Sequence, residues 1–236
     1  SWTVLGEEVI TEYVKRTSAL APRPGDLKIV YTAMHGVGTE VVQRVFNHAG
    51  FATLILVDEQ CTPDPDFPTV AFPNPEEPGA IDLALKKARD FGAELVIAND
   101  PDADRCAAAI NDPVVGWRML RGDELGIILG EWIARTKPAG TFGNSIVSSS
   151  ALKKISAHYG IDFQEVLTGF KWLAKIENLA FGYEEAIGYS VDSETVNDKD
   201  GISAAIFLAQ VAMDLKRDGL TLSDLLNEVW ERHGFH

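Results

Sequence analysis

Residues 27–57 read LKIVYTAMHGVGTEVVQRVFNHAGFATLILV and contain a complete strand–helix–strand pattern. Residues 27–31 combine β-branched and aromatic side chains between Pro24-Gly25 and Gly36, which predicts a strand. Residues 39–49 repeat apolar side chains at helical spacing and stop at Gly50, a residue suited to the left-handed end of a helix. Because residues 53–57 are again typical of a strand, the segment predicts one β–α–β unit.

The following residues extend this alternation. A proline-rich loop over residues 61–78 precedes an expected helix over 80–91 and a third strand over 94–98. A returning strand over 106–110 and the turn Asn111-Asp112-Pro113 complete the unit. Alternating strands and helices predict a mainly parallel sheet with helices on both faces, whose ligands gather at the carboxyl ends of the strands.

The pattern starts again after residue 117. Together the two patterns predict two consecutive α/β domains with mixed, mainly parallel sheets, residues 1–117 and 118–236. We expect Ser148-Ser149-Ser150 to cap a helix of the second domain. That domain is expected to hold helices over 122–134, 151–159, 170–177, 202–216 and 222–232, and strands over 145–147, 163–167 and 180–183.

The composition is that of an ordinary globular protein, with 46% hydrophobic residues in 236. A formal charge of -14 argues against nucleic acid or an anionic membrane as the main partner. Cys61 and Cys106 form neither a disulfide framework nor a zinc motif. The sequence has no apolar run of about 18 residues and no signal-peptide pattern. We therefore expect a cytoplasmic protein and, because it starts at Ser1 without methionine, a piece of a longer one.

Three aspartates alternate directly after the third expected strand, in Asn99-Asp100-Pro101-Asp102-Ala103-Asp104-Arg105. Their carboxylates can turn toward one hard cation such as Mg²⁺, while an arginine can bind phosphate through two parallel hydrogen bonds. They predict metal-assisted chemistry on a phosphorylated substrate, with a polar turn as the alternative. An EF-hand does not fit, because its sixth and twelfth positions hold Arg105 and Asn111 instead of glycine and glutamate.

The motif Gly36-Val37-Gly38 follows a strand and opens a helix, with Asp58 at the end of the next strand. A dinucleotide-binding fingerprint has this arrangement, but Val41 stands where its third glycine or alanine is needed. We expect a tight strand-to-helix turn that presents His35.

A pair of carboxylates, Glu184 and Glu185, ends a strand of the second domain in Gly182-Tyr183-Glu184-Glu185-Ala186-Ile187-Gly188-Tyr189. A carboxylate can accept hydrogen bonds from vicinal sugar hydroxyls. The segments 168–172 and 198–201 lie at neighbouring strand ends and carry Lys171 and Lys199. The sequence thus favours a sugar-phosphate pocket over a solvated acidic turn.

These motifs together resemble those of the α-D-phosphohexomutases, the phosphoglucomutase and phosphomannomutase superfamily, over essentially the whole chain. Residues 100–105 are similar to its metal loop and residues 184–189 to its sugar-recognition loop. The spacers Pro101 and Ala103 and the pair Ala186-Ile187 are most similar to the phosphoglucomutase-2/phosphopentomutase branch. Ala186 stands where other branches have serine, so the preferred sugar stays open. Supporting matches are residues 32–38, 72–77, 168–171 and 199–201.

The resemblance implies a mutase that interconverts a sugar 1-phosphate with its 6-phosphate or 5-phosphate through a phosphoserine and a bisphosphate intermediate. The sugar would be glucose, mannose or a pentose. By resemblance, Asp100, Asp102 and Asp104 bind Mg²⁺ and Arg105 stabilises the transferring phosphoryl group. The implied sugar and phosphate contacts are Glu184, Ala186, Thr168, Gly169, Lys171 and Lys199, with His35 as a further candidate.

The family has four domains, and this chain resembles the second and third. The phosphoserine motif Ser-His-Asn-Pro of domain 1 and the phosphate motif Arg-x-Ser-Gly-Thr of domain 4 do not occur in the sequence. We therefore expect the isolated chain to fold without catalysing the reaction, and its partners to be domains 1 and 4 of the same enzyme.

Two other functions share some of these features. A noncatalytic sugar-phosphate binding module stays open. A standalone phosphatase would need a nucleophilic Asp-x-Asp at the first strand end, where the chain has Thr32-Ala33-Met34.

Overall fold

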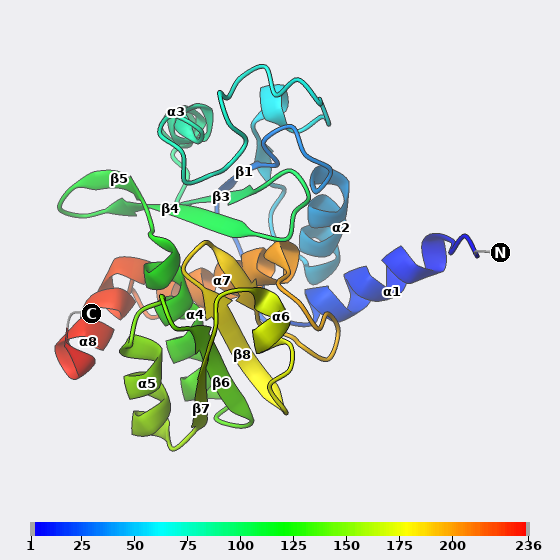
Figure 1. The fold of residues 1–236 in the computed structure, drawn as a ribbon. Coiled ribbons are helices and arrows are strands. Elements are labelled where there is room, and N and C mark those ends of the chain that lie inside the picture. The colour runs from blue at the N-terminus through cyan, green and yellow to red at the C-terminus, as the bar shows by residue number, and fades with distance from the viewer. Residues whose placement is uncertain (1–2, 235–236) are drawn as a thin grey trace.

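The structure is a computed structural model that describes residues 3–234, so the outer ends of both predicted domains lie outside the described range. In Figure 1 the elements of the first half of the chain lie above those of the second half, and helix α7 (Gly201–Arg217) runs between them.

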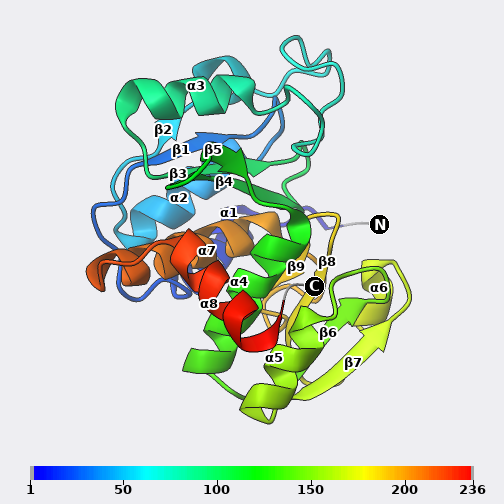
Figure 2. The same ribbon diagram turned by 90° about the vertical axis from the view of Figure 1, so that its left-hand side faces the viewer.

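The first sheet has five strands in the order β2-β1-β3-β4-β5. Strand β1 pairs in parallel with β2 and β3, whereas β4 and β5 join in antiparallel fashion. Figure 2 shows α3 (Asp82–Phe91) above this sheet and α2 (Thr39–Ala49) with α7 below it. Helices on both faces explain why β1 and β3 are buried throughout. The strands are β1 (Ile29–Thr32), β2 (Ile55–Leu56), β3 (Leu95–Asn99), β4 (Cys106–Asp112) and β5 (Gly116–Met119), and η1 (Asp58–Gln60) is a short 3₁₀ helix.

The second sheet has the order β7-β6-β8-β9, with β6 parallel to β7 and β8 and with β9 antiparallel to β8. Helices α4 (Gly122–Thr136) and α5 (Ala151–Tyr159) pack against the sheet, as does the short α6 (Phe170–Leu173) with a small apolar cluster of its own. Helix α8 (Leu222–His233) packs on α4 and α5. The strands are β6 (Thr141–Ser145), β7 (Asp162–Val166), β8 (Leu179–Glu184) and β9 (Gly188–Ser190).

Helix α7 joins the two halves. It contacts β3 and β4 of the first sheet as well as β9 and α4 of the second half. It is buried along almost its whole length, as expected for a helix that is apolar on all sides. The main apolar core therefore runs from one half into the other without interruption.

The two predicted α/β units with mixed, mainly parallel sheets are confirmed. Some predicted elements are wrong. The strand predicted over 145–147 is β6 at Thr141–Ser145, and Ile146 and Val147 lie exposed after it. Gly143 weakens the strand signal of β6, but its missing side chain leaves room for Leu173 and Ile176. The short strands β5 and β9 were not expected, and α6 ends four residues before the predicted end at 177.

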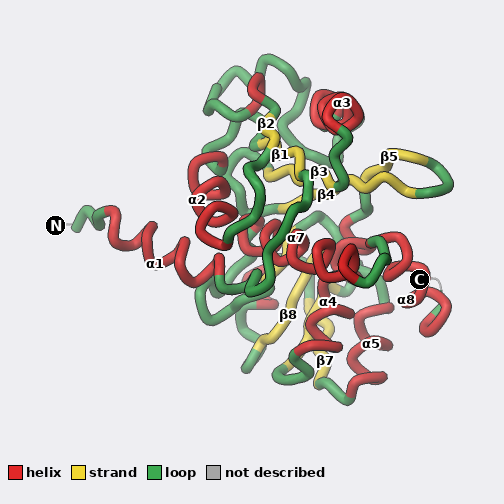
Figure 3. Tube along the Cα trace, turned by 180° about the vertical axis from the view of Figure 1, so that it is seen from behind, coloured by secondary structure: helices red, strands yellow, loops and turns green. Residues whose placement is uncertain are grey.

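Helix α1 (Glu7–Ser18) projects from the body of the molecule, and the two ends of the described chain lie far apart (Figures 1 and 3). Its inner end packs against α2 and α7. No helix within residues 3–234 is both long and apolar enough to cross a lipid bilayer.

Candidate metal and sugar-phosphate site

The three alternating aspartates converge at the carboxyl end of β3. One carboxylate oxygen from each of Asp100, Asp102 and Asp104 lies within 4.8 Å of the others. Asp100 is buried, Asp104 is half-buried and Asp102 is exposed. Ala103 adopts a positive φ of 61°, which turns the chain sharply between the last two aspartates. The loop thus forms a compact set of hard oxygen donors.

Arg105 fixes the buried aspartate of this loop. Its backbone N–H donates to Asp100 Oδ1 at 2.9 Å, and its Nε donates to Asp100 Oδ2 at 2.5 Å. Burial raises the pKa of Asp100, and the hydrogen bonds and charge of Arg105 offset only part of this effect. Arg105 is therefore an ion-pair partner within the loop in addition to its predicted role with phosphate.

Two glycines let other elements approach the metal loop. A Cβ on Gly36 would lie 2.3 Å from the carbonyl oxygen of Pro101, which accepts a hydrogen bond from the N–H of Val37 at 2.9 Å. A Cβ on Gly201 would lie 2.2 Å from the carbonyl oxygen of Arg105. The predicted tight turn at Gly36 thus supports the metal loop, a contact that the strand–turn–helix pattern did not indicate.

His35 contacts the segment that follows β2 and the proline-rich loop. Its ring Nε2 lies 2.7 Å from Thr69 Oγ1, and its backbone N–H donates to the carbonyl of Gln60. The side chain is buried and tied to the proline-rich loop. The ring of His35, predicted as a further sugar or phosphate contact, is therefore bonded to the proline-rich loop in this structure.

The sugar-recognition loop begins at the end of β8. Glu184 Oε1 accepts a hydrogen bond from the backbone N–H of Gly169 at 2.6 Å, which joins two of the predicted substrate residues. The neighbouring Ala186 is exposed, as is Thr168 on the adjacent loop. Gly169 itself has a φ of 114°, a conformation that favours glycine.

Ser148 holds the second carboxylate of this loop. Its hydroxyl lies 2.9 Å from Glu185 Oε2 and 3.0 Å from the backbone nitrogen of Glu185. Ser145 Oγ donates to the same Glu185 oxygen at 3.0 Å. The expectation that the serine cluster caps α5 is wrong for Ser148, because its hydroxyl bonds to Glu185. The N-cap residue of α5 is Ser150, which makes no side-chain cap hydrogen bond, and Ser149 Oγ accepts from the first helical N–H, that of Ala151.

The two loops meet across the domain junction. The N–H of Cys106 donates to the carbonyl of Ile187 at 3.0 Å, and the ammonium of Lys199 forms an ion pair with Asp104. Glu76 of the proline-rich loop, which was not predicted as a site residue, interacts electrostatically with Arg105 and Glu185; its pKa is raised mainly by burial. The sequence does not indicate that Glu76 lies near Arg105 and Glu185, because these residues belong to three separate loops.

Lys171 contacts Trp172 in place of the aspartates. It is exposed, and its Nζ lies 5.7 Å from the centre of the Trp172 ring, over which Lys175 also lies. Among the predicted cationic residues, Arg105 and Lys199 are thus the two that contact the aspartates.

Fold and site place the chain among α/β proteins of two domains with an acidic loop at the carboxyl end of the first sheet. Two family models identify it further. Residues 9–116 match domain II of phosphoglucomutase/phosphomannomutase, and residues 121–233 match its domain III, both described as α/β/α domains. The chain belongs to the phosphoglucomutase/phosphomannomutase family.

Known relatives agree with this assignment. A probable phosphomannomutase of Haemophilus influenzae is 46% identical over 99% of this chain, which spans 49% of that protein. A mouse phosphopentomutase is 40% identical over 89% of this chain, which spans 37% of it. The fold resembles that of a Burkholderia thailandensis phosphoglucomutase/phosphomannomutase family protein, with a TM-score of 0.79 at 20% identity over 94% of this chain and 46% of that one. The chain therefore spans half or less of the length of these relatives.

Proposed function

We propose that this chain is the metal-binding and sugar-binding part of a phosphosugar mutase that interconverts sugar 1-phosphates with 6-phosphates or 5-phosphates through a phosphoserine and a bisphosphate intermediate. The observation that carries the proposal is the meeting of the aspartate loop with the Glu184 loop, through Cys106–Ile187 and Lys199–Asp104. Carboxylates for a metal, cations for phosphate and acceptors for hydroxyls thereby lie at one junction.

The three aspartates are suitable ligands for Mg²⁺. This ion takes six oxygens at about 2.0–2.1 Å, so its ligands are about 2.9 Å apart when adjacent and about 4.2 Å apart when opposite. The observed oxygens lie within 4.8 Å of one another, and the exposed Asp102 can move to close the set. When bound, the ion supplies positive charge that offsets the charge of a transferring phosphoryl group.

The residues of the chain have separate roles in this proposal. Arg105 holds Asp100 in place and presents the remaining guanidinium edge to a phosphoryl group. Glu184 is oriented by Gly169 and accepts sugar hydroxyls. The remaining proposed contacts with sugar or phosphate are Thr168, Ala186, Lys171 and Lys199.

The relatives are named for different substrates, so the proposal includes more than one sugar. They include a probable phosphomannomutase, phosphopentomutases and glucose 1,6-bisphosphate synthases. We therefore propose a phosphorylated glucose, mannose or pentose. We also propose a cytoplasmic location, which is consistent with two free cysteine thiols.

The proposed catalytic serine and distal phosphate loop lie in domains 1 and 4, so we expect the 236-residue chain alone to be inactive. The test compares it with the product of the complete reading frame, using 1-phosphates of glucose, mannose and ribose with MgCl₂. We expect turnover only from the longer protein, reduced at least about 100-fold by Asp102→Asn. Turnover by the 236-residue chain would overturn the proposed division of labour. Binding without turnover by the complete protein would favour the noncatalytic module.

A further inference from the structure

We propose that Lys199 is a built-in counter-cation of the metal loop, which neutralises Asp104 in the metal-free protein and is displaced when a divalent ion binds. The inference rests on the proposed metal-binding function of residues 100–104. It concerns a contact between the two domains, because Lys199 comes from the segment between β9 and α7.

The backbone around Lys199 is held on both sides. The N–H of Asp200 donates to the carbonyl of Tyr189 in β9, and the carboxylate of Asp200 caps α7 by accepting from the N–H of Ile202 at 3.0 Å. The N–H of Gly201 donates to the carbonyl of Ala103, which attaches the segment to the metal loop itself. The backbone from which the Lys199 side chain extends is therefore held beside the aspartate loop.

The stem of Lys199 has a defined path to Asp104. Its Cδ would lie 3.1 Å from a Cβ on Gly188, so the stem passes directly over this glycine. The ammonium pairs with Asp104 Oδ2, and 28% of the Lys199 side chain and 31% of that of Asp104 remain exposed. The pair is thus accessible to ions from solution.

The charges of the loop explain why a counter-cation is useful. Three carboxylates within 4.8 Å of one another repel strongly without cations nearby. Arg105 pairs with Asp100 and lies 3.9 Å from Asp104 Oδ1, and the ammonium of Lys199 pairs with the other carboxylate oxygen of Asp104. A divalent ion that takes one oxygen from each aspartate removes this repulsion, so the lysine is no longer needed there.

Lys199 is the more readily displaced of the two cations. Arg105 binds both oxygens of Asp100 and belongs to the same loop, whereas Lys199 offers a compact, well-hydrated charge on a flexible stem. Once released, its ammonium is available to a phosphate group at the same junction. Binding of metal and phosphate then favour each other, since coupling between two sites is reciprocal.

The test is a calorimetric titration of the 236-residue chain with MgCl₂. We expect Lys199→Met to tighten Mg²⁺ binding about three- to fivefold, the affinity equivalent of a half-exposed ion pair. Lys199→Arg should weaken binding, because a guanidinium can hold Asp104 through two hydrogen bonds. Lys153→Met, a change at an exposed lysine of helix α5, serves as the matched control and should leave the Mg²⁺ affinity within about twofold of the wild type. Thermal unfolding checks that each variant is folded.

The outcomes separate this inference from the proposed function. Equal or weaker binding by Lys199→Met, while Asp102→Asn abolishes binding, would overturn the role of Lys199 and leave the metal site standing. Absence of Mg²⁺ binding in the wild type and in Lys199→Met would overturn both the role of Lys199 and the proposed metal site. As a second measurement, glucose 6-phosphate should tighten Mg²⁺ binding in the wild type and do so less in Lys199→Met.

Discussion

The Tyr13 hydroxyl lies within hydrogen-bonding distance of both carboxylate oxygens of Asp200, at 3.0 and 2.8 Å. Asp200 is buried and caps helix α7, directly beside Lys199. Burial raises the pKa of Asp200, and the Tyr13 hydroxyl opposes this rise by stabilising the charged form. The projecting helix α1 is thereby connected to the segment that contacts the metal loop.

Tyr13→Phe removes a donor from a buried carboxylate, so we expect a loss of about 1–3 kcal/mol in the free energy of unfolding at pH 7. The loss should shrink as the pH falls through the folded-state pKa of Asp200, because the protonated carboxyl needs the donor less. Urea unfolding at several pH values measures both effects. Glu12→Gln, which removes an exposed ion pair on the same helix, is the control and should cost clearly less than Tyr13→Phe. Equal effects of the two changes would contradict the role of Tyr13.

Gly201→Ala distinguishes helix propensity from steric fit. Propensity alone predicts a gain, because alanine is the better helix former, although at this first helical position it should be smaller than the ~1 kcal/mol of a helix interior. The structure predicts the opposite sign, since the new Cβ would lie 2.2 Å from the carbonyl oxygen of Arg105. We expect a loss of about 1–3 kcal/mol on urea unfolding. Gly182→Ala, whose Cβ would meet flexible Leu179 methyl carbons at 3.3 Å and beyond, should cost clearly less.

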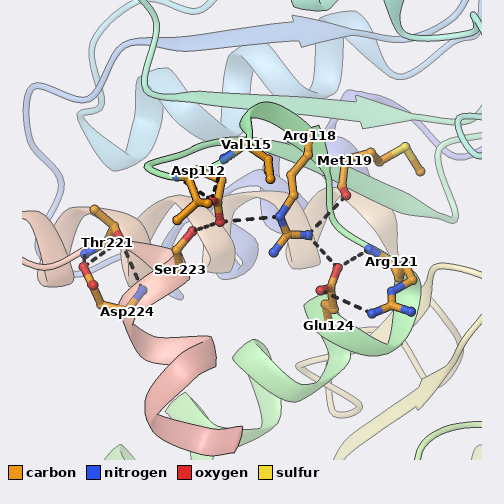
Figure 4. A network of polar contacts seen from close by, with 10 residues as sticks. Asp112, Val115, Arg118, Met119, Arg121, Glu124, Thr221, Ser223 and Asp224 are labelled. Carbon is orange, nitrogen blue, oxygen red and sulfur yellow. Dashed lines mark hydrogen bonds and ion pairs between the residues drawn. The ribbon is translucent and has the colours of Figure 1, made fainter. Parts of the chain in front are cut away.

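Arg118 connects the β4–β5 hairpin to helix α4 and, through Asp112, to α8 (Figure 4). Its Nη1 donates to Glu124 Oε2 at 2.9 Å, its Nε lies 3.6 Å from Asp112 Oδ2, and Ser223 donates to the same Asp112 oxygen. A double-mutant cycle of Arg118→Met and Glu124→Gln should give a coupling energy of about 0.5–3 kcal/mol in urea unfolding.

Arg121 provides the matched control for this cycle. It lies 3.7 Å from the other oxygen of the same glutamate, but its side chain is 71% exposed. Arg121→Met should therefore couple to Glu124→Gln by less than about 0.5 kcal/mol. Equal coupling energies of the two arginines with Glu124 would contradict the expectation that the less exposed Arg118 contact is the stronger one.

Glu131 should make stability sensitive to acid. Its Oε1 accepts hydrogen bonds from Arg135, Arg232 and Tyr159 at 2.7, 2.6 and 2.8 Å. Burial acts to raise the pKa of Glu131, but these donors outweigh it and hold the pKa below 4.5. The charged carboxylate thus stabilises the fold above about pH 4.5, and this contribution is lost as the pH falls through the lowered pKa.

Glu131→Gln should cost about 1–3 kcal/mol near neutral pH, because two arginines lose a buried charged partner but keep their ion pairs with Glu228. The difference from the wild type should narrow as the pH falls below 4.5, where the wild-type carboxylate is also neutralised. Unfolding free energies from urea titrations across this pH range provide the measurement. A difference that stays constant with pH would show that the charge of Glu131 does not matter.

Local patterns were sufficient for much of the fold. The helices over 39–49 and 151–159 have the predicted ends, because each stops at a left-handed glycine that the sequence displays. The strand before the aspartates was predicted to within one residue, since its apolar run is continuous. Strands β5 and β9 were missed because they are short and gain their stability from pairing with a neighbour.

The two α/β units, the aspartate loop at a strand end and the carboxylates of the sugar loop are recognisable in the sequence, because neighbouring residues encode each of them. How these parts contact one another depends on the folding of the whole chain. Lys199 reaches Asp104 across 95 residues, and Ser148 reaches Glu185 across 37. Such contacts have no local spacing that a sequence could reveal; they depend on how α7 packs between the sheets and where glycines let the backbones approach.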